Sequence, residues 1–192
     1  YGPDDPDYFQ RWTNAQTSST YDFFDMTASF AGGQVTSTKV STYTPNRVFF
    51  GLSNGRIVRV DNANTGAPAG TNITGTGMSA SNVSCVAAGT TDNNLLATFS
   101  NYGSIHVWFS TVGGGAAGWT NITGTGLPDI PVRWAMFNPE DNDKAILATE
   151  MGIYETTDIN GASTVWVQNG TLPVVKTNML QYRFNDNTVL AS

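Results

Sequence analysis

One stretch of seven residues occurs twice in this chain. Residues 71–77 read Thr-Asn-Ile-Thr-Gly-Thr-Gly, and the same letters return 49 positions later at residues 120–126. A period of this length is typical of solenoids and propellers, in which each unit is a small supersecondary structure that its neighbours must cover. The repeat therefore constrains the architecture before any single residue is considered.

Each period divides into four short apolar runs separated by turn residues. Glycines at Gly55, Gly103 and Gly152 mark the turn between the second and third runs. The second runs are almost continuously apolar, which predicts strands buried on both faces. These second runs are residues 48–50, 95–97, 145–148 and 189–191. Four strands in about 45–50 residues match one blade of a β-propeller.

We therefore predict an all-β fold, a β-propeller of four-stranded blades that is an incomplete part of a larger ring. The expected blades are residues 35–77, 78–126 and 127–172, and a further blade starts in 173–192.

Residues 1–34 fit the repeat poorly, so we expect a linker or the outer part of a preceding blade. Within this segment, residues 8–12 are a candidate outer strand and residues 22–30 a candidate connection. Because the chain begins without Met and ends in an apolar run, we expect an excerpt of a longer polypeptide.

The composition favours an extracellular all-β protein. Charged residues make up 12% of the chain, against roughly 25% in ordinary soluble domains, and Thr, Ser, Asn and Gly supply the polarity instead. The net charge is −6 and the nine Lys and Arg residues are scattered, so we expect no nucleic-acid partner. No run approaches the ~18 apolar residues of a membrane span. Cys85 and His106 are the only residues of their types, which favours structural roles for both.

The third unit carries a degenerate motif. Thr156, Asp158, Gly161, Thr164 and Trp166 follow one another in the order Thr, Asp, Gly, Thr, Trp. This series resembles the Asp-box of the bacterial neuraminidase repeat, Ser/Thr-x-Asp-x-Gly-x-Thr-Trp, with stretched spacing. The resemblance implies structural roles, with Asp158 in a hairpin and Trp166 packed between sheets.

Residues 35–192 as a whole resemble large secreted proteins of Bacteroidota-type bacteria that carry neuraminidase-like or sortilin-like propeller repeats, often as cargo of type IX secretion. The resemblance implies a secreted or cell-surface location. It also implies extracellular glycans or other surface proteins as partners, together with the remaining blades or domains of the parent chain.

Five residues are candidates for ligand binding. Glu150 lies in the turn between the second and third strands of its unit, a type of loop that lines one mouth of a propeller, and Arg133 is expected near the same mouth. The aromatic side chains of Tyr102, Trp134 and Tyr154 are candidates for stacking on sugar rings. The alternatives are an ion pair or solvated loop charges for Glu150 and Arg133, and core packing for the aromatic residues.

Asp141 and Asp143 are weak candidates for Ca²⁺, because this ion prefers closely spaced carboxylate and amide oxygens. The alternative is a solvated hairpin turn, since simple turns stand at the same place in the sister units. We expect no other cofactor.

We expect a non-catalytic module for glycan binding, adhesion or surface assembly, and we assign no catalytic residue. One alternative is a glycoside hydrolase whose cleft is completed by blades absent from this sequence; such an enzyme needs a second carboxylate opposite Glu150. Another is a structural subunit of an extracellular assembly.

Overall fold

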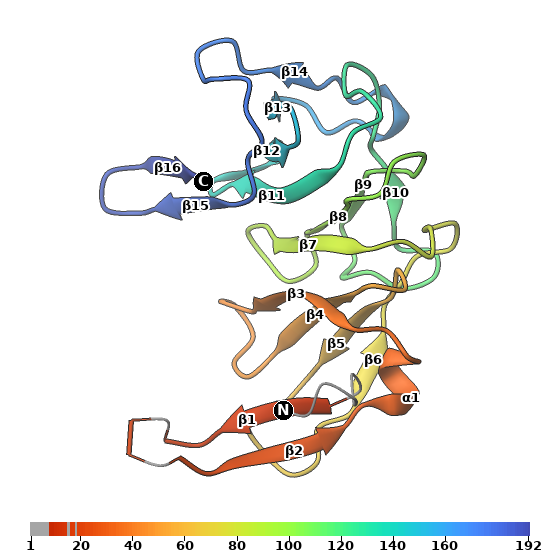
Figure 1. The fold of residues 1–192 in the computed structure, drawn as a ribbon, viewed down its shortest axis with the longest axis vertical. Helices are drawn as coiled ribbons and strands as arrows, with labels where there is room; N and C mark the ends of the chain where they lie inside the picture. Colours follow the sequence, from red (N-terminus) through yellow and green to blue (C-terminus); the bar gives the residue numbers. More distant parts are fainter. Residues whose placement is uncertain (1–7, 15, 18) are drawn as a thin grey trace.

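The computed structural model describes residues 8–14, 16–17 and 19–192. Three four-stranded antiparallel sheets are stacked on one another, and a two-stranded hairpin lies at each end of the stack (Figure 1). The remainder of the expected N-terminal segment, residues 1–7, 15 and 18, lies outside the described residues.

The three complete sheets share one strand order, in which each strand pairs with the next along the chain. Blade 1 consists of β3 (Val35–Val40), β4 (Val48–Leu52), β5 (Ile57–Val60) and β6 (Gly70–Asn72). Blade 2 consists of β7 (Val83–Ala88), β8 (Leu95–Phe99), β9 (Val107–Ser110) and β10 (Thr120–Asn121). Blade 3 consists of β11 (Val132–Asn138), β12 (Asp141–Thr149), β13 (Gly152–Thr156) and β14 (Val167–Gln168). A short 3-10 helix, η1 (Gly161–Ser163), precedes β14.

The terminal hairpins are β1 (Tyr8–Trp12) with β2 (Tyr21–Asp25) and β15 (Leu180–Arg183) with β16 (Thr188–Ala191). Residues 22–30 are therefore not a simple connection as expected, because most of β2 falls within them and α1 (Thr27–Phe30) follows. In β2 the side chains alternate between the two faces of the hairpin, with Tyr21 and Phe23 on one face and Asp22 and Phe24 on the other. This is a strand pattern, but it does not occur in the repeated units from which the other strands were predicted.

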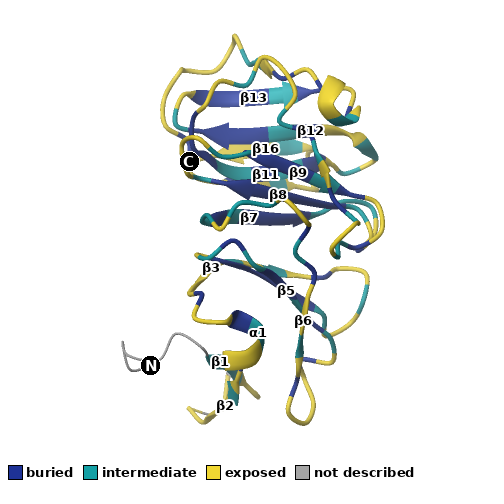
Figure 2. Cartoon of the chain, turned by 90° about the vertical axis from the view of Figure 1, so that its right-hand side faces the viewer, coloured by how far each residue is buried: buried dark blue, intermediate teal, exposed yellow. Residues whose placement is uncertain are grey.

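The core lies between the sheets. All five residues of β4 and of β8 are buried, which confirms the prediction from their continuous apolar runs. Phe49 and Ile57 of blade 1 pack with Leu95 and Trp108 of blade 2 in one cluster. Figure 2 shows the buried residues concentrated in the strands.

The same prediction is wrong for residues 189–191. Val189 is 36% exposed and Leu190 is 49% exposed. The physical reason is that β16 has a neighbouring sheet on one side only, whereas β4 and β8 are covered on both faces.

A tryptophan joins each pair of complete blades. Trp119 donates its indole N–H to the carbonyl of Ile73 at 2.7 Å, and Trp166 donates to Ile122 at 2.9 Å. Both indoles are buried. Trp166 therefore packs between two sheets, as the neuraminidase-repeat resemblance implies.

The loop before Trp166 is closed by threonine hydroxyls. The hydroxyl of Thr156 accepts the N–H of Asp158, and the hydroxyl of Thr164 accepts the N–H of Asn160. Asp158 itself is exposed.

The turn at Gly55 shows why the repeat needs glycine. Gly55 has φ +85°, and an added Cβ would lie 2.1 Å from the carbonyl oxygen of Ser79. A side chain there would meet both a backbone conformation that L-residues avoid and the backbone of the next unit.

Within the described part of the chain, no helix has the length and apolar character of a membrane span.

Candidate functional site

The first strands of successive sheets lie next to one another. β3 contacts β7, β7 contacts β11, and β11 contacts β15. Each of the three complete blades carries a β-bulge near the start of its first strand, at Thr36, Ser84 and Arg133. A bulge re-aims a side chain away from the alternation of the strand.

The bulged residues do different things in different blades. Thr36 donates its hydroxyl to the carbonyl of Val83 at 2.7 Å, and Ser84 donates to Val132 at 2.5 Å, so each ties its strand to the first strand of the next blade. Arg133 instead donates to the carboxylate of Glu150 in the turn between β12 and β13. The third blade therefore has a charged pair at the position where blades 1 and 2 have a hydroxyl group that bonds to the next blade.

The structure thus brings together Arg133 and Glu150, which the sequence placed at one mouth. Their side chains are 32% and 24% exposed, and Nε of Arg133 is buried without a hydrogen-bond partner among the described residues. A half-buried carboxylate held by a guanidinium is an ion pair with a fixed orientation. This geometry is the ion-pair alternative of the sequence analysis.

The three candidate aromatic residues are separated by the fold. Tyr102 is 66% exposed in the turn between β8 and β9. Trp134 is half-buried on β11, where one side packs against the core. Tyr154 is 5% exposed and lies in the core cluster between blades 2 and 3, so its ring presents no free face to a ligand.

Asp141 and Asp143 lie at the start of β12, directly after the tight turn of the β11–β12 hairpin. Oδ1 of Asp141 accepts the N–H of Asp143 at 3.0 Å, and Oδ2 lies 2.9 Å from Nζ of Lys144. The hydrogen bond from Lys144 holds the pKa of the Asp141 carboxyl below its usual value. Among the described residues, no three His, Cys, Asp or Glu side chains gather in a way that could hold a metal ion.

A hollow of about 310 Å³ lies along the first strands of the sheets. We call it the inner-strand hollow. Its lining combines aromatic rings with a few polar groups and includes Lys39, Tyr43, Trp134, Gln181, Tyr182 and Phe184. Of the sequence candidates, only Trp134 takes part.

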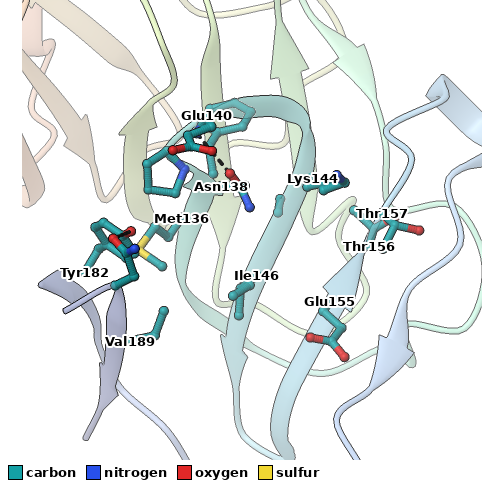
Figure 3. A pocket seen from close by; sticks show the side chains of 14 residues that line it. Met136, Asn138, Glu140, Lys144, Ile146, Glu155, Thr156, Thr157, Tyr182 and Val189 are labelled. Carbon is teal, nitrogen blue, oxygen red and sulfur yellow. Dashed lines mark hydrogen bonds between the residues drawn. The ribbon is translucent and has the colours of Figure 1, made fainter. Parts of the chain in front are cut away.

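A second hollow, of about 390 Å³, lies between blade 3 and the β15–β16 hairpin. We call it the blade 3 hollow. Figure 3 shows Glu155 and Ile146 on the sheet, with Tyr182 and Val189 on the hairpin. It occupies the place where a complete next blade would cover the sheet.

The sequence analysis did not predict the contact between His106 and Asp129. His106 is 2% exposed, and its Nε2 lies 2.9 Å from Oδ1 of Asp129. The N–H of Gly103 donates to the same oxygen at 2.7 Å, and this bond, followed by that to His106, lowers the pKa of the Asp129 carboxyl. The pair ties the turn between β8 and β9 to the segment before β11. Cys85 is also buried, and burial raises the pKa of its thiol to about 11.

No protein-family model matches the chain, and no curated protein matches it by sequence. Its fold is similar to several solved structures. One is the β-propeller domain of Cps50 (Swd1) from Myceliophteria thermophila, with a TM-score of 0.59 and 16% identity over 83% of this chain and 49% of that one. Another is Sqt1 from Saccharomyces cerevisiae, with a TM-score of 0.57 and 12% identity over 96% of this chain and 56% of that one.

A third similar structure is the GH74 enzyme of Niastella koreensis, with a TM-score of 0.56 and 18% identity over 77% of this chain and 25% of that one. The chain therefore spans about half of the Swd1 domain and a quarter of the GH74 enzyme. At these identities the similarity concerns the fold alone. The chain is a β-propeller in part, built from four-stranded antiparallel blades, as the repeat predicts.

Proposed function

We propose that this chain is a non-catalytic binding module of a secreted or cell-surface protein, and that its inner-strand hollow binds an extracellular glycan. The observation that carries the proposal is the lining of the hollow. Tyr43 is 49% exposed, Phe184 is 76% exposed, and the side chains of Trp134 and Tyr182 belong to the same lining. Aromatic rings beside a few polar groups suit a ligand with apolar faces and a hydroxyl rim.

The inner-strand hollow also has polar side chains that can form hydrogen bonds with the hydroxyl groups of a sugar. Lys39 supplies an ammonium donor, and Gln181 supplies an amide that both donates and accepts. The lining includes no Asp or Glu within the described residues. Because glycoside hydrolysis needs two carboxylates that flank the scissile bond, this hollow suits binding rather than cleavage.

The extracellular setting of the proposal rests on the low charge and on the resemblance to secreted Bacteroidota-type propellers with Asp-box repeats. The type IX route belongs to the same resemblance. The glycoside hydrolase alternative would use Glu150, which the structure pairs with Arg133. That alternative requires a second carboxylate from blades outside this chain, and a structural subunit requires partner surfaces on the rims.

The test is an oligosaccharide binding screen followed by titration calorimetry of the best ligand with two matched variants. Phe184→Ala removes an exposed ring from the hollow, and Tyr102→Ala removes an exposed ring from the β8–β9 turn. We expect the first to weaken binding by roughly tenfold, equivalent to about 1.4 kcal/mol, and the second to leave it unchanged. Loss of binding in Tyr102→Ala alone would move the site to the mouth that holds Arg133 and Glu150. Release of reducing sugar at enzymatic rates would refute the non-catalytic role.

A further inference from the structure

The inner-strand hollow is lined mainly by the three complete blades. Lys39 comes from β3, residues 85–88 come from β7 and residues 134–137 come from β11. β3 contacts β7, and β7 contacts β11. The surroundings of Lys39 are therefore fixed by the stacking of complete sheets.

Lys39 points from blade 1 toward blade 2. It pairs with Phe49 across β3 and β4, and directly opposed residues of antiparallel strands project to the same face. Phe49 is fully buried in the cluster between blades 1 and 2, whereas Lys39 is half-buried. Burial raises the pKa of the Cys85 thiol on β7 to about 11, and the positive charge of Lys39 acts on it in the opposite direction. The ammonium group therefore lies near β7, at the hollow.

The charge of Lys39 has no counter-ion. In the part of the chain that the structure describes, six of the nine Lys and Arg side chains form ion pairs with Asp or Glu: Arg11, Arg47, Arg59, Arg133, Lys144 and Arg183. Arg56 donates to the carbonyl of Ser29 at 3.1 Å, and Lys176 is exposed. Among the described residues, Lys39 is thus the one cation that is half-buried without a partner oxygen.

The missing counter-ion does not reflect a shortage of carboxylates, because the chain has 15 Asp and Glu against nine Lys and Arg. The carboxylates in the turns after β7 and β15 are engaged elsewhere. Asp92 accepts from Arg47 at 3.1 Å, and Asp186 accepts from Arg183 at 2.8 Å. Glu140 lines the blade 3 hollow instead (Figure 3). The inner-strand hollow thus keeps a positive charge in a chain of net charge −6.

The aromatic walls of the hollow are held in place by their own contacts. The hydroxyl of Tyr43 donates to the carbonyl of Gly89 at 2.6 Å, and the hydroxyl of Tyr182 donates to Oδ1 of Asn187 at 2.7 Å. The rings of Tyr182 and Phe184 meet edge to face, 4.8 Å apart. Walls that are already ordered lose less conformational entropy when a ligand binds.

The polar groups of the lining are rich in hydrogen-bond donors. The Lys39 ammonium has three donors and no acceptor. The exposed Thr42 adds a hydroxyl, and the amide nitrogen of Gln181 makes only a long bond of 3.4 Å, to the carbonyl of Tyr182. A carboxylate or a sulfate is an oxygen group that accepts several such bonds and carries the opposite charge.

We propose that the ligand of the inner-strand hollow is an acidic glycan, and that Lys39 binds its carboxylate or sulfate group. This inference rests on the proposed function and specifies the class of glycan. Carboxylate and sulfate share the chemistry that the hollow requires, a negative charge on oxygen acceptors. The aromatic walls contact the sugar ring, and the ammonium of Lys39 contacts its charged substituent.

The ion pair with the ligand should add affinity because the hollow replaces water around Lys39 without supplying an acceptor. A half-buried ammonium has lost part of its hydration, and an anionic oxygen makes a charge-assisted hydrogen bond with it. For a partly exposed group this bond is worth roughly tenfold in affinity. The net charge of −6 repels anions at long range, so an acidic glycan needs this local cation to bind tightly.

The experiment is titration calorimetry with two matched pairs of oligosaccharides. One pair is a galacturonic acid oligomer and the same oligomer with its carboxyl groups methylated. The other is a sulfated galactose oligomer and its desulfated form. We expect the charged member of one pair to bind roughly tenfold more tightly than its neutral counterpart, and the pair that shows this preference identifies the anionic group.

Three variants assign the preference to Lys39. Lys39→Gln should remove it, and Lys39→Arg should keep most of it because the charge remains. Lys176→Gln is the matched control, since it removes the same charge from an exposed position between β14 and β15, outside the lining, and should leave the preference unchanged. Circular dichroism checks that each variant is folded.

The salt dependence of binding gives a readout that needs no variant. Raising NaCl from about 50 mM to about 500 mM should weaken binding of the charged oligomer several-fold and leave the neutral one nearly unchanged, because salt screens the ion pair. If Lys39→Gln does not fold, this comparison decides alone.

The inference is overturned if neither charged oligomer binds more tightly than its neutral counterpart, if Lys39→Gln keeps the preference, or if Lys176→Gln loses it as well. A neutral glycan whose binding depends on Phe184 would still support the proposed function in each of these cases. The two proposals therefore fail separately.

Discussion

Replacing Trp166 by Phe tests the claim that each blade is fastened to the one before it by a buried indole. Trp166 is 2% exposed, and its N–H donates to the carbonyl of Ile122, which accepts no other hydrogen bond among the described residues. The smaller ring leaves a cavity that costs about 1 kcal/mol. The buried carbonyl left without a donor costs about 1–3 kcal/mol more. We therefore expect Trp166→Phe to lower the free energy of unfolding by about 2–4 kcal/mol, a large share of a typical total.

Trp119→Phe is the matched control, because it removes the same kind of bond in a different environment. The carbonyl of Ile73 also accepts the N–H of Gly115 at 2.7 Å, so it keeps one partner after the substitution. We expect a loss of about 1–2 kcal/mol, smaller than for Trp166→Phe by about 1 kcal/mol or more. Urea unfolding followed by circular dichroism measures both. The reasoning fails if Trp166→Phe stays within about 0.5 kcal/mol of the unmodified protein, or if the two variants lose the same amount.

Three further outcomes can be checked with simple assays. Glu150→Gln should lower the free energy of unfolding by about 1 kcal/mol in urea titrations, between the values for exposed and buried ion pairs, because it leaves Arg133 unpaired; no loss would mean that solvent already screens the pair. Cys85 should resist thiol reagents at about pH 8 until the chain is unfolded, since burial raises its pKa to about 11; rapid labelling of folded protein would contradict this. The Asp129 carboxyl has a lowered pKa in the folded protein, so its contribution to the free energy of unfolding is present above about pH 4 and is lost as the pH falls through the folded-state pKa. In the unmodified protein the urea midpoint should therefore fall between about pH 5 and about pH 3, and Asp129→Asn should make this fall smaller. An unchanged fall would assign the acid sensitivity to other groups.

Much of the fold follows from local pattern. The apolar runs at 48–50 and 95–97 predict β4 and β8 because a strand buried on both faces has no polar alternation to display. The turn at Gly55 is visible in the sequence because only glycine tolerates that backbone and that contact. By contrast, β2 was missed, since its aromatic alternation occurs only once in the chain and no repeat supports it.

The candidate site was less predictable. Arg133 and Glu150 were placed together correctly, because corresponding turns of stacked units face one mouth. Tyr154 could not be assigned to core or surface from sequence, since strand aromatic residues serve both. The inner-strand hollow was missed because its lining runs from Lys39 to Phe184, positions that become neighbours only when four sheets stack.

The sequence by itself determined the unit: a four-stranded sheet whose turns, buried strands and period are all written in residues a few positions apart. Only the tertiary structure decided how the units meet, including the bulged Arg133 that turns to Glu150. The physical reason is range. Backbone conformation and strand alternation depend on adjacent residues, whereas burial and pairing across blades depend on contacts between residues about 50 positions apart, for which a local pattern contains no register.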